Sequence, residues 1–157
     1  IAGGGALSRT SSLPRFTCPW QVTCCSVRGP LARLRPLIRH SGPGPATEPL
    51  DFLPRCPRAL FSFGLPIANG NKKARASAAA LPAAALLTET DAPYQPPRGD
   101  PPPGAEGDRR PLLRAYSTVG DLPRVVAELA AIRGLSPGAV EAMVEENFMG
   151  VFGDGIR

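Results

Sequence analysis

The sequence has few of the nitrogen and sulfur side chains from which proteins build structural zinc sites. Its 157 residues include one histidine, His40, and four cysteines. The cysteines are Cys18, Cys24, Cys25 and Cys56. A structural zinc site needs Cys-x-x-Cys pairs with further Cys or His partners, and this spacing is absent. We therefore expect no structural zinc, and free thiols in a reducing compartment.

Acidic residues are missing from the beginning of the chain. No Asp or Glu precedes Glu48, whereas arginine occurs six times in the same stretch. An acid-free segment with Arg and Ser is typical of organelle transit peptides. The alternatives are a basic surface or a truncated chain. The start at Ile1 rather than Met favours truncation or processing. We expect a cytoplasmic protein, or an organelle protein if this segment is a transit peptide. The net charge of +5 is compatible with a polyanionic partner without specifying one.

Long hydrophobic runs are also absent. The best candidate, residues 76–87, has twelve residues that include Ser and Pro, whereas a membrane-spanning helix needs about 20 apolar residues. We expect no membrane association. What the chain has in abundance is proline and glycine, 20 and 17 residues, a composition that approaches the low-complexity range. The length predicts one domain, with much irregular structure.

Hydrophobic periodicity predicts an alternation of strands and helices. The strand candidates are residues 20–27, 37–39, 58–64 and 84–88. A short helix interrupted by Pro36 is expected before the second strand, and the alanine-rich stretch "NGNKKARASAAALP" predicts another before the fourth. The order strand, helix, strand, loop, strand, helix, strand is typical of a parallel α/β sheet.

The end of the chain predicts two further helices after a proline-rich loop at residues 92–111. Apolar residues recur at helical spacing over residues 122–132, and Gly134 can end that helix. Ser136 and Pro137 form a favourable start for the next one. Its apolar side chains, interpreted as core packing, are Val140, Met143, Val144 and Phe148.

One strand candidate ends in carboxylates. In "LLTETDAPY", residues 86–94, Glu89 and Asp91 follow a short apolar run and come just before Ala92 and Pro93. Carboxylates are rarely fully buried unless they are paired or bound to a metal. This strand end is therefore either an exposed rim or a functional site.

The motifs from this stretch onward resemble the TatD family of metal-dependent deoxyribonucleases. The Glu-Thr-Asp-Ala-Pro motif is followed at the family's spacing by a helix, a glycine and a last helix; the matching residues are Gly134, Ser136, Asn147, Val151 and Phe152. Upstream, "LFSFGLPIANGNKKARASAAALP" resembles the family's Phe-Ser strand and following helix, and "LIRHSGPGPATEPL" its His-Ser strand end. The resemblance covers residues 19–157 as a partial hydrolase domain and leaves residues 1–18 as an unassigned basic segment.

This resemblance implies the C-terminal half of a TIM-like (β/α)₈ metal-dependent hydrolase barrel, with Pro-rich loops and two C-terminal helices. Barrel enzymes place their chemistry at the C-terminal ends of the strands. By the resemblance, Asp91 is a metal ligand and catalytic residue, His40 is a second metal ligand, and Glu89 supports them or is structural. The implied cofactor is a divalent ion (Mg, Mn or Zn), the implied substrate DNA, and the reaction phosphodiester hydrolysis.

The sequence also departs from the family. The family's His-x-His pair and a middle Glu would precede this chain, and Thr23 stands where the family has another His. The chain is therefore expected to be a fragment or a diverged homologue of such a hydrolase. The alternative is a non-catalytic barrel fragment that serves as an interaction module, with open strand edges that favour self-association. A nucleic-acid-binding module acting through the basic N-terminal half is less supported, because stacking aromatic residues are lacking.

Overall fold

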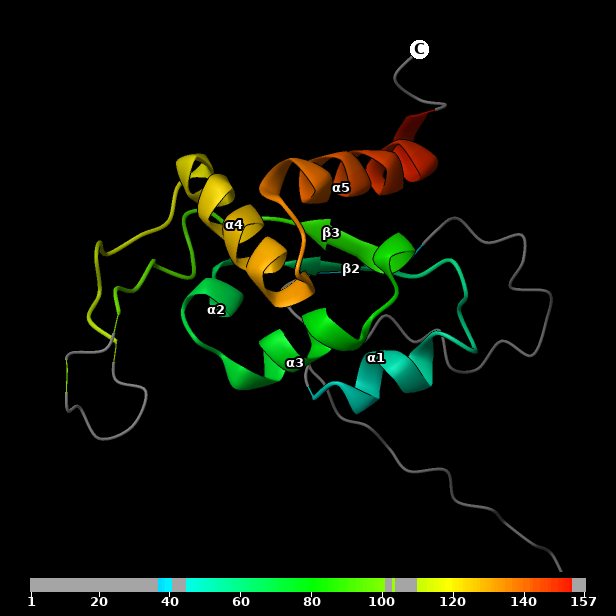
Figure 1. Ribbon diagram of the computed structural model, residues 1–157, viewed down its shortest axis with the longest axis horizontal. Helices are drawn as coiled ribbons and strands as arrows, with labels where there is room; N and C mark the ends of the chain where they lie inside the picture. Colours follow the sequence, from blue (N-terminus) through cyan, green and yellow to red (C-terminus); the bar gives the residue numbers. More distant parts are fainter. Residues whose placement is uncertain (1–36, 41–44, 101–102, 104–109, 154–157) are drawn as a thin grey trace, which may run out of the picture. The chain divides into compact units, whose positions relative to one another are not determined.

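The computed structural model describes residues 37–40, 45–100, 103 and 110–153 (Figure 1). Several predicted features lie outside these ranges: the strand at residues 20–27 with Thr23, the helix after it, and three of the four cysteines. Nearly all of the acid-free beginning lies outside them as well. The expectations about a transit peptide and about cytoplasmic or organelle location therefore stay predictions. No described helix is long and apolar enough to cross a membrane.

Three parallel strands form the sheet. They are β1 (Ile38–Arg39), β2 (Leu60–Phe63) and β3 (Leu86–Thr88), in the order β1-β2-β3. Ile38 pairs with Leu60, and Phe61 pairs with Leu86. Parallel neighbours require crossover connections, which here contain the helices α1 (Thr47–Phe52), α2 (Leu65–Ala68) and α3 (Lys72–Ala80). The predicted parallel α/β arrangement is confirmed.

The central strand β2 is buried along its whole length. Such a continuous apolar run is typical of parallel strands, which are covered on both faces. Figure 1 shows α1, α2 and α3 on one side of β2 and β3, and the last helix, α5, on the other. The largest fully buried side chains of the core include Phe61, Phe63, Leu65, Ile67, Leu81, Leu86 and Leu129.

Two short helices were not predicted. Residues 47–52 were expected to be loop, but they form α1, in which Phe52 packs edge-on against Phe61 with ring centroids 6.3 Å apart. No side chain caps the N-terminus of α1, so tertiary packing rather than local sequence favours it. Residues 65–68 were not assigned to any element, yet they form α2, with Pro66 in its first turn, where a fixed φ and a missing N–H are tolerated.

The alanine-rich helix α3 was predicted, and its N-terminus is well capped. The Asn71 side chain accepts hydrogen bonds from the N–H groups of Lys73 and Ala74, both at 3.1 Å. Small residues on its buried face, Ala74, Ser77 and Ala78, allow a close approach to the core. The following strand is shorter than the predicted 84–88, because residues Ala83–Ala85 form a 3₁₀ turn.

The two C-terminal helices match the prediction in position and in their end signals. Helix α4 (Leu122–Arg133) ends at Gly134, whose φ of 65° is left-handed, and the Ser136 side chain caps α5 (Pro137–Phe152) through the N–H of Ala139. The interpretation of the apolar stripe on α5 as core packing is wrong for its far end. Val140 is fully buried, but Phe148 is 41% exposed, because no described element covers that part of the helix.

The 3₁₀ turn Val119–Asp121, which leads into α4, is stabilised by a buried carboxylate. Asp121 accepts a hydrogen bond from the Thr118 N–H at 2.8 Å and is paired with the Arg114 guanidinium. Burial alone would raise the pKa of the Asp121 carboxyl. The Thr118 N–H and Arg114 outweigh burial and hold this pKa below its ordinary value.

This lowered pKa predicts an acid-sensitive contribution to stability. A carboxyl whose pKa is lower in the folded state stabilises the fold above its unfolded pKa of about 3.9, and this stabilisation is lost as the pH falls through the folded pKa. We expect Asp121→Asn to lower the free energy of unfolding at pH 7, and the difference from wild type to shrink below about pH 4. Urea denaturation across this pH range measures it.

The matched control is Asp100→Asn, because the Asp100 side chain is 98% exposed. This variant should differ little from wild type at any pH. A stability deficit of Asp121→Asn that stays constant between pH 7 and pH 2 would contradict the assignment.

Candidate functional site

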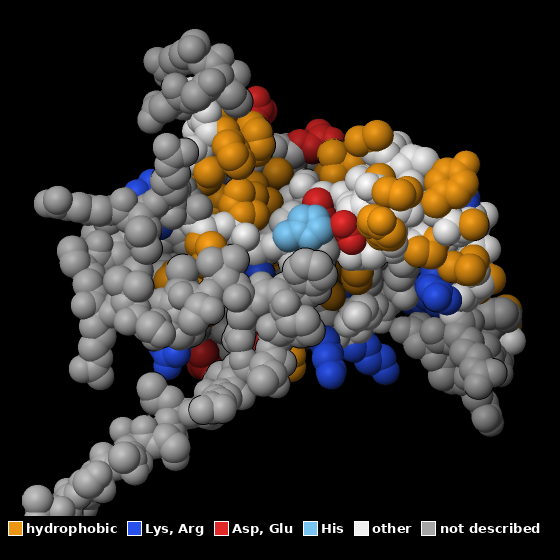
Figure 2. Space-filling view, turned by 180° about the vertical axis from the view of Figure 1, so that it is seen from behind, with side chains coloured by type: hydrophobic (Ala, Val, Ile, Leu, Met, Phe, Trp, Pro, Cys, Tyr) orange, Lys and Arg blue, Asp and Glu red, His pale blue; other side chains and the backbone are white. Residues whose placement is uncertain are grey.

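The carboxyl ends of β1 and β3 bring together the side chains that the sequence singled out. His40 directly follows β1, and Glu89 and Asp91 follow β3. His40 Nε2 lies 3.3 Å from Glu89 Oε2 and 3.5 Å from Asp91 Oδ1. The histidine side chain is 60% exposed, whereas those of Glu89 and Asp91 are 13% and 21% exposed. Figure 2 shows the histidine beside acidic side chains, with hydrophobic side chains next to them.

A glycine at the end of the central strand leaves room for these side chains. Strand β2 lies between β1 and β3 and is followed by Gly64. A Cβ at Gly64 would lie 3.3 Å from Glu89 Cγ and 3.5 Å from Gln95 Oε1. Because position 64 has no side chain, groups from β3 and its loop can occupy the space over the end of β2. The side chain of Glu89 therefore reaches across towards His40.

The backbone after β3 turns sharply at Asp91. Its φ of 55° is left-handed, a conformation that Asp adopts more readily than most residues. The Tyr94 N–H donates to the Asp91 carbonyl at 2.7 Å, and the Ala92–Pro93 peptide bond is cis. Buried Ser117 holds this turn from the segment before α4, through its N–H to the Pro93 carbonyl at 3.0 Å and its hydroxyl to the Tyr94 carbonyl.

The sequence gave no indication of the role of Gln95. Its Nε2 donates to Asp91 Oδ2 at 2.7 Å. An amide four residues downstream in a proline-rich loop has no recognisable pattern, because the contact depends on the left-handed backbone at Asp91 and again at Gln95, whose φ is 57°. The stretch after Gln95 is fixed by Asn69, which donates to the Pro96 carbonyl and accepts from the Arg98 N–H.

The arrangement fits two ligands of one divalent cation. Ligand atoms about 2.1 Å from a tetrahedral ion lie about 3.4 Å apart, close to the 3.5 Å between His40 Nε2 and Asp91 Oδ1. A neutral imidazole and a carboxylate suit Zn²⁺ and Mn²⁺, and the carboxylate also suits Mg²⁺. Among the described residues, no group of three or more His, Cys, Asp or Glu side chains forms a metal site. Further ligands would have to come from elsewhere.

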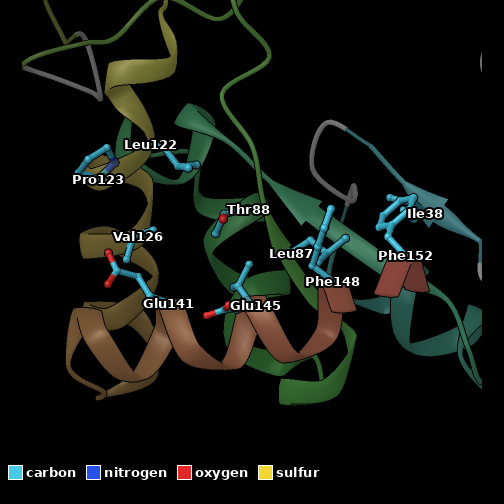
Figure 3. A pocket seen from close by; sticks show the side chains of 11 residues that line it. Ile38, Leu87, Thr88, Leu122, Pro123, Val126, Glu141, Glu145, Phe148 and Phe152 are labelled. Carbon is cyan, nitrogen blue, oxygen red and sulfur yellow. The ribbon is translucent and has the colours of Figure 1, made fainter. Parts of the chain in front are cut away.

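A second feature is an apolar groove of about 550 Å³ next to β3 (Figure 3). It is lined by Ile38, Leu87, Thr88, Leu122, Pro123, Val126, Glu141, Val144, Glu145, Phe148 and Phe152. Strand β3 is the last in the sheet order, so one of its edges has no neighbouring strand among the described residues. Asn147 donates from α5 to the Leu86 and Ala83 carbonyls, both at 2.8 Å, and so fixes the helix beside β3.

Comparison with known proteins finds similarity to one family model and to solved structures. The family model described as TatD related DNase matches residues 30–153. The crystal structure of YjjV, a TatD homologue from Escherichia coli K12, is similar with a TM-score of 0.60 and 23% sequence identity. The alignment covers 74% of this chain and 40% of YjjV. A search of curated proteins found no match.

These matches bear on the predicted organisation. The described strands and helices correspond to about 40% of a TatD barrel, which confirms the predicted fold class. The division at residue 18 is not tested and stays a prediction. Because the family model extends over most of the chain and includes His40, Glu89 and Asp91, the chain belongs to the TatD-related DNase family.

Proposed function

We propose that this chain contributes the C-terminal part of a divalent-metal-dependent hydrolase site that acts on DNA phosphodiester bonds. The observation that supports the proposal is the meeting of His40 and Asp91. They come from the ends of two non-adjacent parallel strands, and their Nε2 and Oδ1 atoms lie 3.5 Å apart. The ends of barrel strands are where this fold places catalytic groups, and family membership makes DNA the substrate to test first.

Each side chain has a distinct role in this proposal. His40 offers a neutral imidazole Nε2, and Asp91 offers Oδ1, as ligands to the cation. When bound, a divalent cation polarises the phosphate and lowers the pKa of a water molecule. In the same role, the negative charge of the Asp91 carboxylate would help to activate the attacking water beside the cation. Glu89 Oε2 lies 3.3 Å from His40 Nε2, so a cation bound at Nε2 would also lie near this carboxylate, whose negative charge would help to balance it.

The proposal predicts that metal stabilises the folded chain. A ligand that binds only the folded state raises its stability by about 2.7 kcal/mol at 100 times its dissociation constant. We expect Mn²⁺, Mg²⁺ or Zn²⁺ to raise the melting temperature of the wild type, and to leave that of Asp91→Asn and His40→Gln nearly unchanged. Circular dichroism melts with and without each metal measure this.

The matched control is Asp51→Asn, which removes an exposed carboxylate at the end of α1. It should keep the full metal response. An equal rise in wild type and Asp91→Asn would show that the metal binds elsewhere. DNA cleavage by the metal-loaded chain, alone or with the missing ligands supplied by another polypeptide, then tests the reaction itself.

A second candidate function is an interaction module that associates with another copy of the chain. The groove beside β3 favours it, because Phe148 and Phe152 are 41% and 40% exposed, with ring centroids 4.6 Å apart. An open strand edge beside apolar side chains is a common site of self-association. Glu141 and Glu145 at the groove would repel their counterparts, so the association should strengthen as salt screens them.

Self-association predicts a molar mass that rises with concentration in size-exclusion chromatography with light scattering. Phe148→Glu places a charge in the groove and should keep the chain monomeric. Met149→Glu is the matched control, because Met149 is the next residue on α5, is 46% exposed and does not line the groove. A wild type that remains monomeric at every concentration and salt would exclude this function.

A further inference from the structure

The two oxygens of the Asp91 carboxylate have different partners. Oδ1 faces His40 Nε2 at 3.5 Å, and Oδ2 accepts a hydrogen bond from Gln95 Nε2 at 2.7 Å. A carboxylate without such a contact can rotate and offer either oxygen, or both, to a cation. The amide of Gln95 occupies one oxygen and leaves the other directed at the imidazole.

The Gln95 amide lies over the end of β2, and the chain just after it is held in place. Its Oε1 lies 3.5 Å from the position that a Cβ at Gly64 would take, so the amide rests over the end of β2. Immediately after it, the Asn69 side chain binds the Pro96 carbonyl at 3.0 Å and the Arg98 N–H at 2.8 Å. These contacts fix the amide before any cation binds, which is the property of a preorganised site.

The backbone at Gln95 also points to a role for its side chain. Its φ of 57° is left-handed, a region that Gly, Asn and Asp adopt readily and that is disfavoured for most other residues. Gln has no local advantage there. Its long amide, however, spans the distance to Asp91, which the shorter side chain of Asn does not.

We propose that Gln95 is a positioning residue that holds Asp91 as a single-oxygen ligand facing His40. This inference rests on the proposed metal site. Hydrogen-bonding partners of metal ligands orient the ligand, and their removal typically lowers metal affinity by about 10- to 100-fold. We expect a loss of this size for Mn²⁺ when the Gln95 amide is removed.

The test is isothermal titration of Mn²⁺ into the full chain and three variants. Gln95→Leu removes the donor at similar size and with a similar backbone cost. Gln95→Asn keeps an amide and suits a positive φ, but it is one carbon too short. Both should bind Mn²⁺ about 10- to 100-fold more weakly than wild type. Tyr94→Ala, the control, alters a neighbouring side chain that is 71% exposed and should bind like wild type.

A second readout separates positioning from a purely structural role. The metal-free melting temperatures should change less than the Mn²⁺ affinity, since the contact is one part-buried hydrogen bond. In the metal-free wild type, the Gln95 side-chain amide resonances should shift on Asp91→Asn. The chain has two glutamines and three asparagines, so few such signals need assignment.

The outcomes distinguish this inference from the proposed function. If the wild type binds Mn²⁺ and both Gln95→Leu and Gln95→Asn bind it with the same affinity, the role of Gln95 is overturned and the metal site stands. An equal loss in Tyr94→Ala would assign the effect to the loop rather than the amide and would also overturn it. No Mn²⁺ binding by the wild type would overturn the metal site and this inference together.

Discussion

The candidate site depends on the absence of a side chain at the end of the central strand. His40 and Asp91 follow the two outer strands of the described sheet, with β2 between them. Adjacent strands are about 4.8 Å apart, so side chains from β1 and β3 must cross the end of β2 to meet. Gly64 leaves that space open, and Glu89 and Gln95 occupy it. A side chain there would press on Glu89 and require it to shift, because a Cβ at position 64 would lie 3.3 Å from Glu89 Cγ.

The loop after β3 is fixed by polar contacts from three separate parts of the chain. Asn69 comes from the end of α2, Ser117 from the segment before α4, and Gln95 from the loop itself. Burial contributes as well, because Ser117 is only 2% exposed. A proline-rich segment with few apolar residues cannot form a core of its own. Here it is ordered where hydrogen bonds attach it to the sheet and helices, and this order places the Asp91 carboxylate.

The sequence predicted the regular elements well wherever local signals agreed with tertiary packing. The strand predicted at residues 58–64 is β2, at residues 60–63, and the helices α4 and α5 lie where periodicity and end signals placed them. The family motifs placed His40 and Asp91 at strand ends of one site, and their side chains lie 3.5 Å apart. Helix α1 was not predicted, because the Phe52–Phe61 contact that favours it spans two elements. The Gln95–Asp91 contact could not be predicted either, because it requires a left-handed backbone at both residues, and no sequence pattern indicates that conformation.

The same physical cause underlies both candidate functions. The chain spans 40% of the length of YjjV. Its described strand ends carry His40 and Asp91, and β3 has an edge with no neighbouring strand among the described residues. The first property favours a metal-dependent hydrolase with additional ligands from elsewhere. The second favours association along β3 and α5, where Phe148 remains exposed. The two are compatible, since a partner that covers this edge would also bring further side chains near the strand ends.

The most direct test of the metal site is the proton NMR signal of the His40 ring during addition of paramagnetic Mn²⁺. His40 is the only histidine of the chain, so its signal is identified without further assignment. If His40 and Asp91 hold the cation, substoichiometric Mn²⁺ should broaden this signal strongly in the wild type and much less in Asp91→Asn. A His40 signal that stays sharp in the wild type, or broadens equally in both proteins, would contradict the proposed site.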